Sequence, residues 1–267
     1  MGAQVPRPGG GRGIPGGVGV LLTVLGCSGT FPGRDSCCSA YLVEEDGFRL
    51  VLDLGNGSIG NLQRHAGLLD LDAVVLSHLH GDHCLDLVPY SYARRYHPQG
   101  RPPPLPVYGP AGTRERLCNA FESPPKDGLR DIYTVQQVRS GKVEIGPFSV
   151  ELFPVAHPVE AYAIRVEAGG RCLAYSGDTG PSLGLLDAAH DVDLLLCEAS
   201  WQSADGLPDN LHLTAREAAW HAGKAGVGRL LLTHLLPWLR PEVSLEQAAA
   251  AFAGPLGLAV TGTTYEV

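Results

Sequence analysis

The sequence predicts an α/β fold in which two mixed β-sheets pack face to face and helices cover their outer sides. Its 267 residues are 44% hydrophobic, enough for a substantial core. The first half of the chain is dominated by strand patterns, and the second half alternates strand with helix. No linker or repeat divides the chain, so we expect a single domain over residues 18–267. A Gly/Pro-rich leader at 1–17 is expected to be disordered.

In the first half, an apolar run at 18–26 predicts a buried strand that ends in a loop of turn-forming residues. Strands at 39–45 and 48–55 are joined at Asp46-Gly47, a hairpin signal. Residues 71–77 predict another buried strand. Helices are expected at 57–67, 84–97 and 111–122, extended chain at 101–106, and a strand at 148–156.

In the second half, strands at 161–168 and 171–178 form a hairpin around Gly169-Gly170. The chain then alternates between helix and strand, as is typical of a parallel sheet. Helices are expected at 181–189, 214–226 and 244–253, and strands at 192–200 and 229–235.

Composition and charge narrow the function classes. The formal net charge of −8 disfavours long nucleic acid as a partner, because phosphate-binding surfaces are usually basic. A local basic patch at Arg94, Arg95 and Arg101 stays open. The apolar run at 18–26 is too short to cross a bilayer and lacks the features of a signal peptide. We therefore expect a cytoplasmic protein without a membrane partner.

Seven cysteines occur at irregular spacings, several of them within apolar runs. The odd number and the spacing favour reduced, mostly buried thiols over a disulfide framework. The vicinal pair Cys37-Cys38 has no redox-type spacing to support a catalytic role.

The motif "HLHGDH" at 78–83 places four potential metal ligands directly behind a buried strand. Three more lie at the ends of other predicted strands, namely His157, Asp178 and His234. Strand ends are rigid, so such residues can converge on one point. Imidazole and carboxylate ligands suit zinc or manganese, and a site without thiolates is of the catalytic kind.

The spacing within the motif suggests two metal ions. His78 and His80 alternate and can point to one side, whereas Asp82 and His83 are adjacent and must diverge. Asp178 has two carboxylate oxygens and could bridge the ions. The alternative for each residue is an ordinary polar turn.

The motifs "HLHGDH", "AHP", "SGDTG" and "LTHLLP" resemble, in order, those of the metallo-β-lactamase-fold hydrolases over residues 18–265. That resemblance implies a metallo-β-lactamase-like αββα sandwich. "HPVEAYAIRV" and "NLHLTAREAA" look most like the phosphodiesterase branch that includes tRNase Z. By this resemblance the first metal ion takes His78, His80, His157 and Asp178, and the second takes Asp82, His83, Asp178 and His234.

The resemblance also implies catalytic roles. Asp82 would hold or accept the proton of a hydroxide that bridges the ions, and His212 would assist the departing oxygen. His212 could instead simply precede a helix capped by Thr214 and Glu217. Glu198 ends a buried strand, where its carboxylate either orients His212 or meets an unrelated partner.

One departure from the family bears on the substrate. The tRNA-processing enzymes carry an arm between the third histidine and the bridging aspartate, but here the separation is 178 − 157 = 21 positions, filled by one hairpin. Arm-less relatives that share "TVLGCSG" and "CEASW" are associated with cyclic-nucleotide phosphodiesterase activity. We therefore favour a small phosphodiester such as 3′,5′-cyclic AMP, cleaved with two divalent ions, zinc or manganese. Relatives of this kind often form homodimers.

Other functions stay open. The alternatives are a tRNase Z-like endoribonuclease that processes tRNA 3′ ends, a glyoxalase II-like thioester hydrolase, and a non-catalytic metal-binding protein. Diiron oxygen chemistry is disfavoured because those relatives usually carry Glu at the position of His80.

The sequence leaves the roles of several other residues open. Ser28, Gly29 and Thr30 either line the pocket or form a plain turn. Candidate substrate contacts are Tyr90, Tyr92 and Arg94. The remaining histidines are expected on the surface or in loops, namely His65, His97, His190 and His221.

Overall fold

The computed structural model describes residues 19–121, 124–204 and 206–267, so the leader expected at 1–17 lies outside the described residues. The strands are β1 (Leu21–Gly26), β2 (Ala40–Glu45), β3 (Phe48–Leu54), β4 (Ala73–Val75), β5 (Leu105–Gly109), β6 (Tyr133–Gln137), β7 (Gly141–Ile145), β8 (Phe148–Pro154), β9 (Tyr162–Ala168), β10 (Arg171–Tyr175), β11 (Leu194–Glu198), β12 (Leu230–Thr233), β13 (Leu256–Leu258) and β14 (Thr264–Glu266). The helices are α1 (Ser58–Leu62), α2 (Gly81–Cys84), α3 (Leu87–Arg95), α4 (Thr113–Cys118), α5 (Leu183–Ala189), α6 (Ala215–Ala225) and α7 (Pro241–Ala249).

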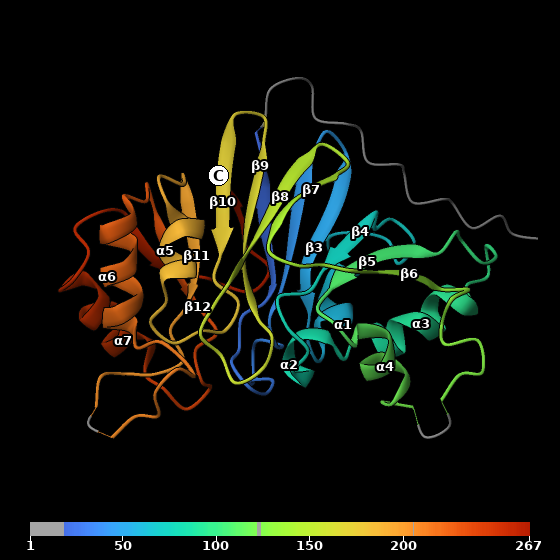
Figure 1. Ribbon diagram of the computed structural model, residues 1–267, viewed down its shortest axis with the longest axis horizontal. Coiled ribbons are helices and arrows are strands. Elements are labelled where there is room, and N and C mark those ends of the chain that lie inside the picture. The colour runs from blue at the N-terminus through green and yellow to red at the C-terminus, as the bar shows by residue number, and fades with distance from the viewer. Residues whose placement is uncertain (1–18, 122–123, 205) are drawn as a thin grey trace, which may run out of the picture.

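The strands form two seven-stranded sheets, with the orders β14-β1-β2-β3-β4-β5-β6 and β13-β12-β11-β10-β9-β8-β7. In the first sheet β3 to β6 run parallel, and β1 pairs antiparallel with β14 and β2. In the second, β10 to β13 run parallel and the β7 to β10 pairs are antiparallel. Both sheets are mixed, as the sequence predicts (Figure 1).

The molecule has four layers, with α5, α6 and α7 on one side and α1 to α4 on the other (Figure 1). The inner faces of the sheets share one core, to which Leu52 contributes from β3 and Leu196 from β11. Two further cores are present, one between each sheet and the helices that cover it. Each fully buried Leu contributes roughly 1.5–3 kcal/mol to stability. The αββα architecture is therefore confirmed.

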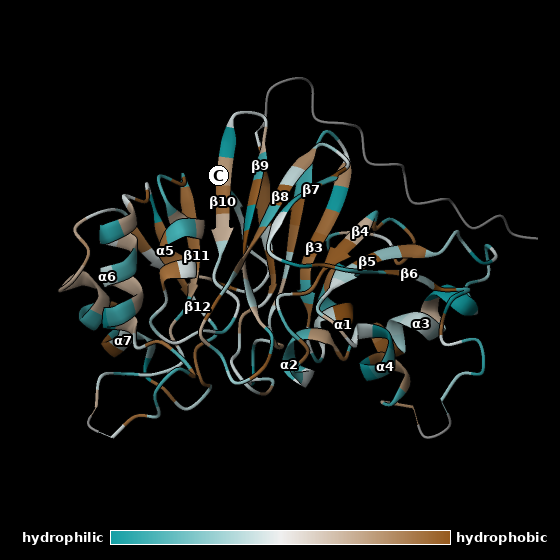
Figure 2. Cartoon of the chain, in the orientation of Figure 1, coloured by the Kyte–Doolittle hydropathy of each residue, from teal (hydrophilic) through white to brown (hydrophobic). Residues whose placement is uncertain are grey.

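Burial along the strands follows from these layers. In β8, Phe148, Val150 and Leu152 face the shared core while the residues between them are partly exposed. All five residues of β11 are buried, because a core covers each face of that strand. Figure 2 shows the same contrast, with brown strands inside and teal on the outer helices. No helix among the described residues is long and apolar enough to cross a membrane.

The helix predicted at 84–97 is wrong as a single element. The chain forms α2 and then α3, because the Asp86 N–H donates to Leu54 O of β3 at 3.0 Å instead of continuing the helical ladder. Pro89 is tolerated because it lies in the first turn of α3, where its missing N–H breaks no helical hydrogen bond.

Other boundaries also differ. The last helix begins earlier than predicted because Pro241, at its first position, presets the helical φ angle. Strands β6, β7, β13 and β14 were not predicted. β13 and β14 have three residues each and are only partly buried, so they carry little periodic signal.

The cysteines are free, and the vicinal pair is buried. Burial raises the pKa of the Cys37 thiol to about 11 and that of Cys38 to about 12. Both are therefore protonated at neutral pH, which agrees with unreactive structural thiols.

Candidate metal centre

The predicted ligands come from both sheets and meet at one edge of the sandwich. His78 and His80 follow β4 of the first sheet, and α2 carries Asp82 and His83. The second sheet supplies its three ligands just after β8, β10 and β12, namely His157, Asp178 and His234. In Figure 1 the connections after these strands lie at the lower edge, beside α2.

These residues form two groups that share Asp178. The first contains His78, His80, His157 and Asp178, and the second contains Asp82, His83, Asp178 and His234. In each group one possible ligand atom from every residue lies within 4.8 Å of the others. The sequence resemblance implied the same two sets.

The donor atoms are spaced as metal ligands require. His80 Nδ1 lies 3.1 Å from both His78 Nε2 and His157 Nε2, and His83 Nε2 lies 3.2 Å from His234 Nε2. Ligands at bond lengths of about 2.0–2.1 Å around a tetrahedral zinc ion are separated by about 3.3 Å. The donor set therefore fits divalent metal ions.

Asp178 lies between the two groups and is 1% exposed. Its Oδ2 is 3.8 Å from His78 Nε2, and its Oδ1 is 3.2 Å from His83 Nε2. Oδ1 has no hydrogen-bond partner within the described part of the chain. A buried carboxylate oxygen without a partner is costly, and a cation at this position would satisfy it.

Protonation states favour metal binding in the first ligand group. Burial lowers the pKa of His78, His80 and His157, so these imidazoles are neutral at pH 7. In the second group, burial alone would lower the pKa of His83, but the carboxylates of Asp178 and Asp53 outweigh it and raise that pKa. Burial alone would raise the pKa of Asp82, but its hydrogen bonds to His234 and His83 keep that pKa well below the usual range. Neutral imidazole and ionised carboxylate are the forms that bind metals.

A buried network around Asp53 orients two ligands and was missed in the sequence. Asp53 Oδ2 accepts hydrogen bonds from Ser77 Oγ at 2.7 Å and from His83 Nδ1 at 2.7 Å. Tyr175 Oη donates to the same oxygen at 2.8 Å, and Ser77 Oγ lies 3.0 Å from His78 Nδ1. Such outer partners fix the orientation of ligand imidazoles. The available signal was one aspartate inside the apolar run "LVLDL".

Backbone geometry aims His234 at the site. His234 has a φ of 55°, in the left-handed region that non-glycine residues rarely occupy. A Cβ at Gly29 would lie 2.5 Å from His234 O, so only glycine allows this approach. The Thr30 N–H donates to Asp82 Oδ2 at 2.9 Å. The 28–30 segment is therefore both a tight turn and part of the site.

His212 and Glu198 form a third group beside the second ligand set. His212 Nδ1 donates to Glu198 Oε1 at 3.0 Å and lies 3.9 Å from Asp178 Oδ2. Burial disfavours the charged imidazole, but the Glu198 carboxylate outweighs this and raises the pKa of His212 to about 9. Glu198 also accepts hydrogen bonds from Thr179 N and Ser200 Oγ, so its position is fixed.

The capping box predicted after His212 is present as well. Thr214 Oγ1 accepts from Glu217 N at 3.2 Å, while the Glu217 carboxylate accepts from Thr214 N at 2.8 Å. The cap and the contact with Glu198 therefore coexist. A cavity of about 590 Å³ opens beside His212, with Trp201 and Asn210 in its lining.

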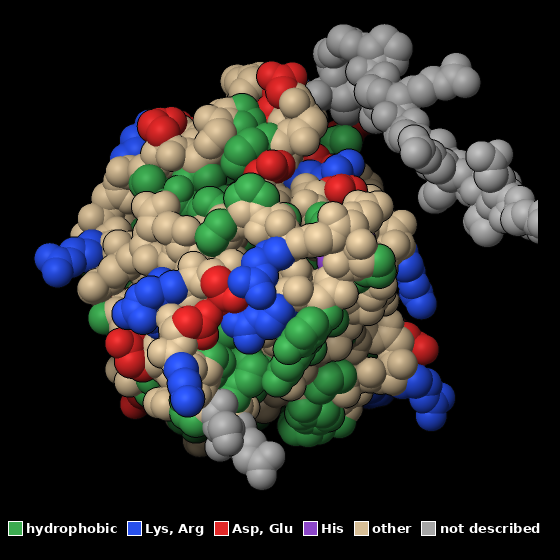
Figure 3. All heavy atoms as spheres, turned by 90° about the vertical axis from the view of Figure 1, so that its right-hand side faces the viewer, with side chains coloured by type: hydrophobic (Ala, Val, Ile, Leu, Met, Phe, Trp, Pro, Cys, Tyr) green, Lys and Arg blue, Asp and Glu red, His purple; other side chains and the backbone are tan. Residues whose placement is uncertain are grey.

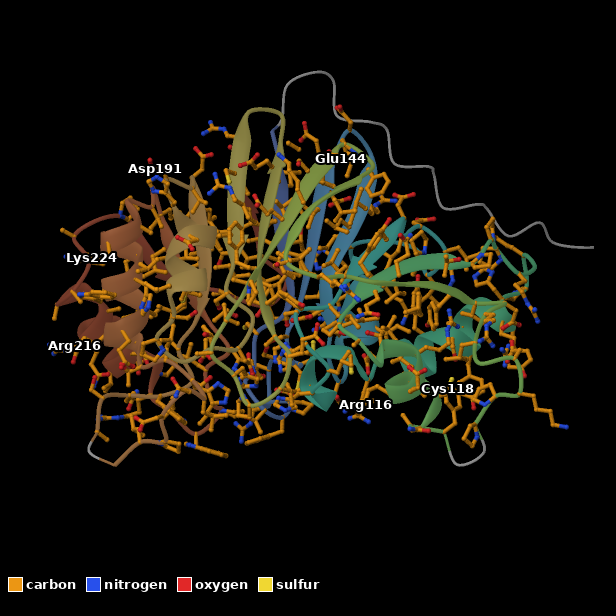
Figure 4. The ribbon with its side chains drawn as sticks, in the orientation of Figure 1. Arg116, Cys118, Glu144, Asp191, Arg216 and Lys224 are labelled. Atoms are coloured by element: carbon orange, nitrogen blue, oxygen red, sulfur yellow. The ribbon has the colours of Figure 1, made fainter. Side chains whose placement is uncertain are left out.

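Arg116 was not singled out in the sequence. Its Nε donates to the carbonyl of Leu79, between two ligand histidines, at 3.1 Å. Figure 4 shows Arg116 at the lower edge of the molecule, where Figure 1 places α2. The other labelled cations, Arg216 and Lys224, lie on the side of α6. Arg116 thus supports the backbone of the histidine motif.

Two of the candidate substrate contacts do not face the site. Tyr90 is buried and its hydroxyl donates to Leu68 O at 2.7 Å. Arg94 is also buried and donates to Pro103 O at 2.7 Å. Tyr92 is exposed and stacks on Tyr96 of the same segment, with ring centroids 6.2 Å apart. Figure 3 shows hydrophobic side chains beside Lys and Arg on the face of the molecule that it presents.

The expectation for His221 is wrong, whereas those for the other three remaining histidines agree with the structure. His65, His97 and His190 lie outside the helices and strands and are not buried. His221 is 2% exposed within α6. The protein tolerates this burial because both ring nitrogens have hydrogen-bond partners. Nδ1 donates to Glu217 O at 2.8 Å, and Nε2 accepts from Ser182 N at 3.3 Å.

The two-sheet fold and the paired histidine and aspartate groups define a metal-dependent hydrolase. Residues 49–235 match the beta-lactamase superfamily domain, and the chain belongs to this metallo-β-lactamase-fold family. An uncharacterized protein of Mycobacterium leprae is 43% identical, over 98% of this chain and 93% of its own. The crystal structure of the metallo-beta-lactamase fold protein YhfI from Bacillus subtilis is 28% identical, covers 92% of this chain and 99% of its own, and has a TM-score of 0.82.

A third relative differs from this chain in length. Ribonuclease Z of Methanosarcina acetivorans is 29% identical in an alignment of 266 positions, which covers 80% of this chain and 87% of its own. Because 80% of 267 residues is fewer than 266 positions, that enzyme has segments that this chain lacks.

Proposed function

We propose that this hydrolase is a binuclear metal-dependent phosphodiesterase whose substrate is a small phosphodiester, 3′,5′-cyclic AMP or a related cyclic nucleotide. The observation that carries the proposal is the arrangement of two ligand groups around Asp178, with His212 3.9 Å away from the same carboxylate. Two divalent ions, zinc or manganese, suit this donor set.

The metal ions would be held by His78, His80, His157 and Asp178, and by Asp82, His83, Asp178 and His234. When bound, such a pair lowers the pKa of water and polarises a phosphoryl oxygen. Asp82 is 12% exposed on its side chain, so it can hold or accept the proton of the attacking water. Glu198 keeps the proton of His212 on Nδ1, and the charged imidazole can donate from Nε2 to the departing oxygen.

Chain length between the ligands supports a small substrate. The 20 residues between His157 and Asp178 contain only the β9–β10 hairpin and its flanking turns, so no arm for a tRNA is inserted there. The net charge of −8 also disfavours a polyanion.

A tRNase Z-like endoribonuclease is the second candidate, favoured by the similarity to ribonuclease Z. Both candidates share the same chemistry and differ in how the substrate is held. We rank the endoribonuclease second because ribonuclease Z contains insertions that this chain lacks.

The test is a parallel assay of the metal-loaded protein on cyclic AMP, cyclic GMP, bis(p-nitrophenyl) phosphate, a precursor tRNA and a glutathione thioester, with metal analysis of the same sample. We expect turnover of the cyclic nucleotides and of the p-nitrophenyl diester. Efficient tRNA or thioester cleavage with no turnover of cyclic nucleotides would overturn the proposal.

A further inference from the structure

Two large aromatic side chains are exposed on the loops that carry Thr30 and His234. Phe31, in the loop after β1, is 38% exposed, and Trp238, in the loop after β12, is 67% exposed. Their ring centroids lie 5.1 Å apart at an interplanar angle of 35°. Exposed apolar side chains that pack together in this way commonly mark a binding surface.

The backbone places this pair next to the metal ligands. The Thr30 N–H, one residue before Phe31, donates to Asp82 Oδ2 at 2.9 Å and lies 3.4 Å from His234 Nε2. The Gly29 N–H donates to Leu235 O at 3.0 Å, which joins the loop of Phe31 to that of Trp238. Consecutive Cα atoms are about 3.8 Å apart. The Cα of Phe31 therefore lies about that far from the Cα of Thr30, whose N–H contacts Asp82 of the second ligand group.

The spacing of the rings determines how they can bind a planar group. A ring inserted between two others needs their planes about 7 Å apart, twice the van der Waals contact distance, and these centroids are closer than that. A ligand can therefore stack only on an outer face. Trp238 has the larger exposed surface, and Phe31 packs against it.

We propose that Trp238, backed by Phe31, is the stacking platform for the nucleobase of the substrate. This inference rests on the function proposed above and narrows its substrate class to nucleoside phosphodiesters. Stacking tolerates any base because every base has a π-face.

The test compares Trp238→Leu with the wild type on cyclic AMP, cyclic GMP and an abasic cyclic phosphate in which hydrogen replaces the base. We expect the KM for both nucleotides to rise about 5–20-fold, within the range measured for loss of one base stack. The kcat for the nucleotides and the KM for the abasic compound should stay at wild-type values. Trp238→Phe keeps a ring and should restore most of the affinity.

Trp220→Leu is the matched control, because Trp220 is 47% exposed on α6 with Lys224 Nζ 5.8 Å from its ring centroid. Figure 4 shows Lys224 on the outer side of α6. This variant should bind nucleotides like the wild type. Quenching of tryptophan fluorescence by adenosine 5′-monophosphate gives a readout without turnover. Trp238→Leu should lose most of this quenching and keep only the part that comes from Trp201 beside His212.

A folded Trp238→Leu protein with wild-type KM values, or with equal changes for the abasic compound, would overturn the platform while the proposed phosphodiesterase activity stands. The platform would also be overturned if Trp238→Leu converts a dimeric wild type to a monomer and leaves the KM for the nucleotides unchanged. That result would show that the pair is a contact between subunits. A wild-type protein that cleaves bis(p-nitrophenyl) phosphate but no cyclic nucleotide would instead overturn the proposed substrate. If such a protein also shows no quenching by the nucleotide, the platform fails too.

Discussion

At the scale of single residues, Asp178 connects the two ligand groups, so its removal should affect both. Asp178→Ala should lose most of the bound metal and more than about 100-fold in activity, a loss that even an outer partner of a ligand can reach. Metal content by mass spectrometry and initial rates on one sample provide the measurement. Asp187→Ala, an exposed change on α5, should behave like the wild type. Normal metal content in Asp178→Ala would contradict a shared ligand.

Asp53 acts through the ligands it orients. Its carboxylate accepts from His83, Ser77 and Tyr175, and Asn keeps the shape but loses one acceptor oxygen and the charge. Asp53→Asn should therefore weaken metal affinity by about 10–100-fold, measured by competition with a fluorescent chelator. Ser77→Ala removes a smaller part of the network and should cost less. Equal metal affinity in Asp53→Asn and the wild type would exclude the orienting role.

His212 is predicted to act in the chemical step and not in metal binding. His212→Ala should keep its metal and lower kcat for cyclic AMP by about 10²–10⁴-fold, the usual contribution of a general acid. With bis(p-nitrophenyl) phosphate the loss should be much smaller, because p-nitrophenolate leaves without a proton. Steady-state rates on both substrates measure the difference. An equal loss on the two would remove the proton-donor role.

At the scale of elements, the strand ends could be predicted because apolar runs such as 71–77 identify buried strands without any tertiary information. The ligands follow those runs directly, so their placement could be predicted as well. The division between α2 and α3 could not, because the Asp86 N–H finds its partner on β3, a contact that local periodicity does not encode. The role of Asp53 was hidden for the same reason, since Tyr175 lies 122 positions away.

Helix α6 follows His212 directly, so its N-terminal cap bears on both stability and the site. Thr214→Ala removes the side chain that accepts from Glu217 N. The change should lower the free energy of unfolding by about 0.5–2 kcal/mol, measured by urea denaturation. Thr134→Ala, an exposed position on β6, should change that free energy by less than about 0.5 kcal/mol. Equal stabilities for the two variants would show that the cap contributes nothing.

At the scale of the whole molecule, the ligands join the two sheets at one edge. β4 belongs to one sheet and β8, β10 and β12 to the other, so bound metal would add a cross-link between layers that already contact through apolar side chains and through the hydrogen bond from Tyr175 to Asp53. Asp178 Oδ1 is buried and has no hydrogen-bond partner among the described residues, so a bound ion would also satisfy this oxygen. Removal of the metal would therefore break a connection between the two sheets without removing any side chain of their shared core.

Removal of metal should consequently lower the thermal stability of the whole fold. A ligand present at 100 times its Kd adds about 2.7 kcal/mol, which for a chain of this size corresponds to roughly 5–10 °C in Tm. We expect a chelator to lower the Tm by that amount and added zinc to restore it, measured by calorimetry with metal content verified in each sample. Asp178→Ala should melt like the chelated wild type and respond little to either treatment. Loss of a cross-link between the two sheets must lower the stability of the fold. An unchanged Tm after verified loss of metal would therefore mean that the metal does not connect the sheets and that their packing alone fixes the ligand residues.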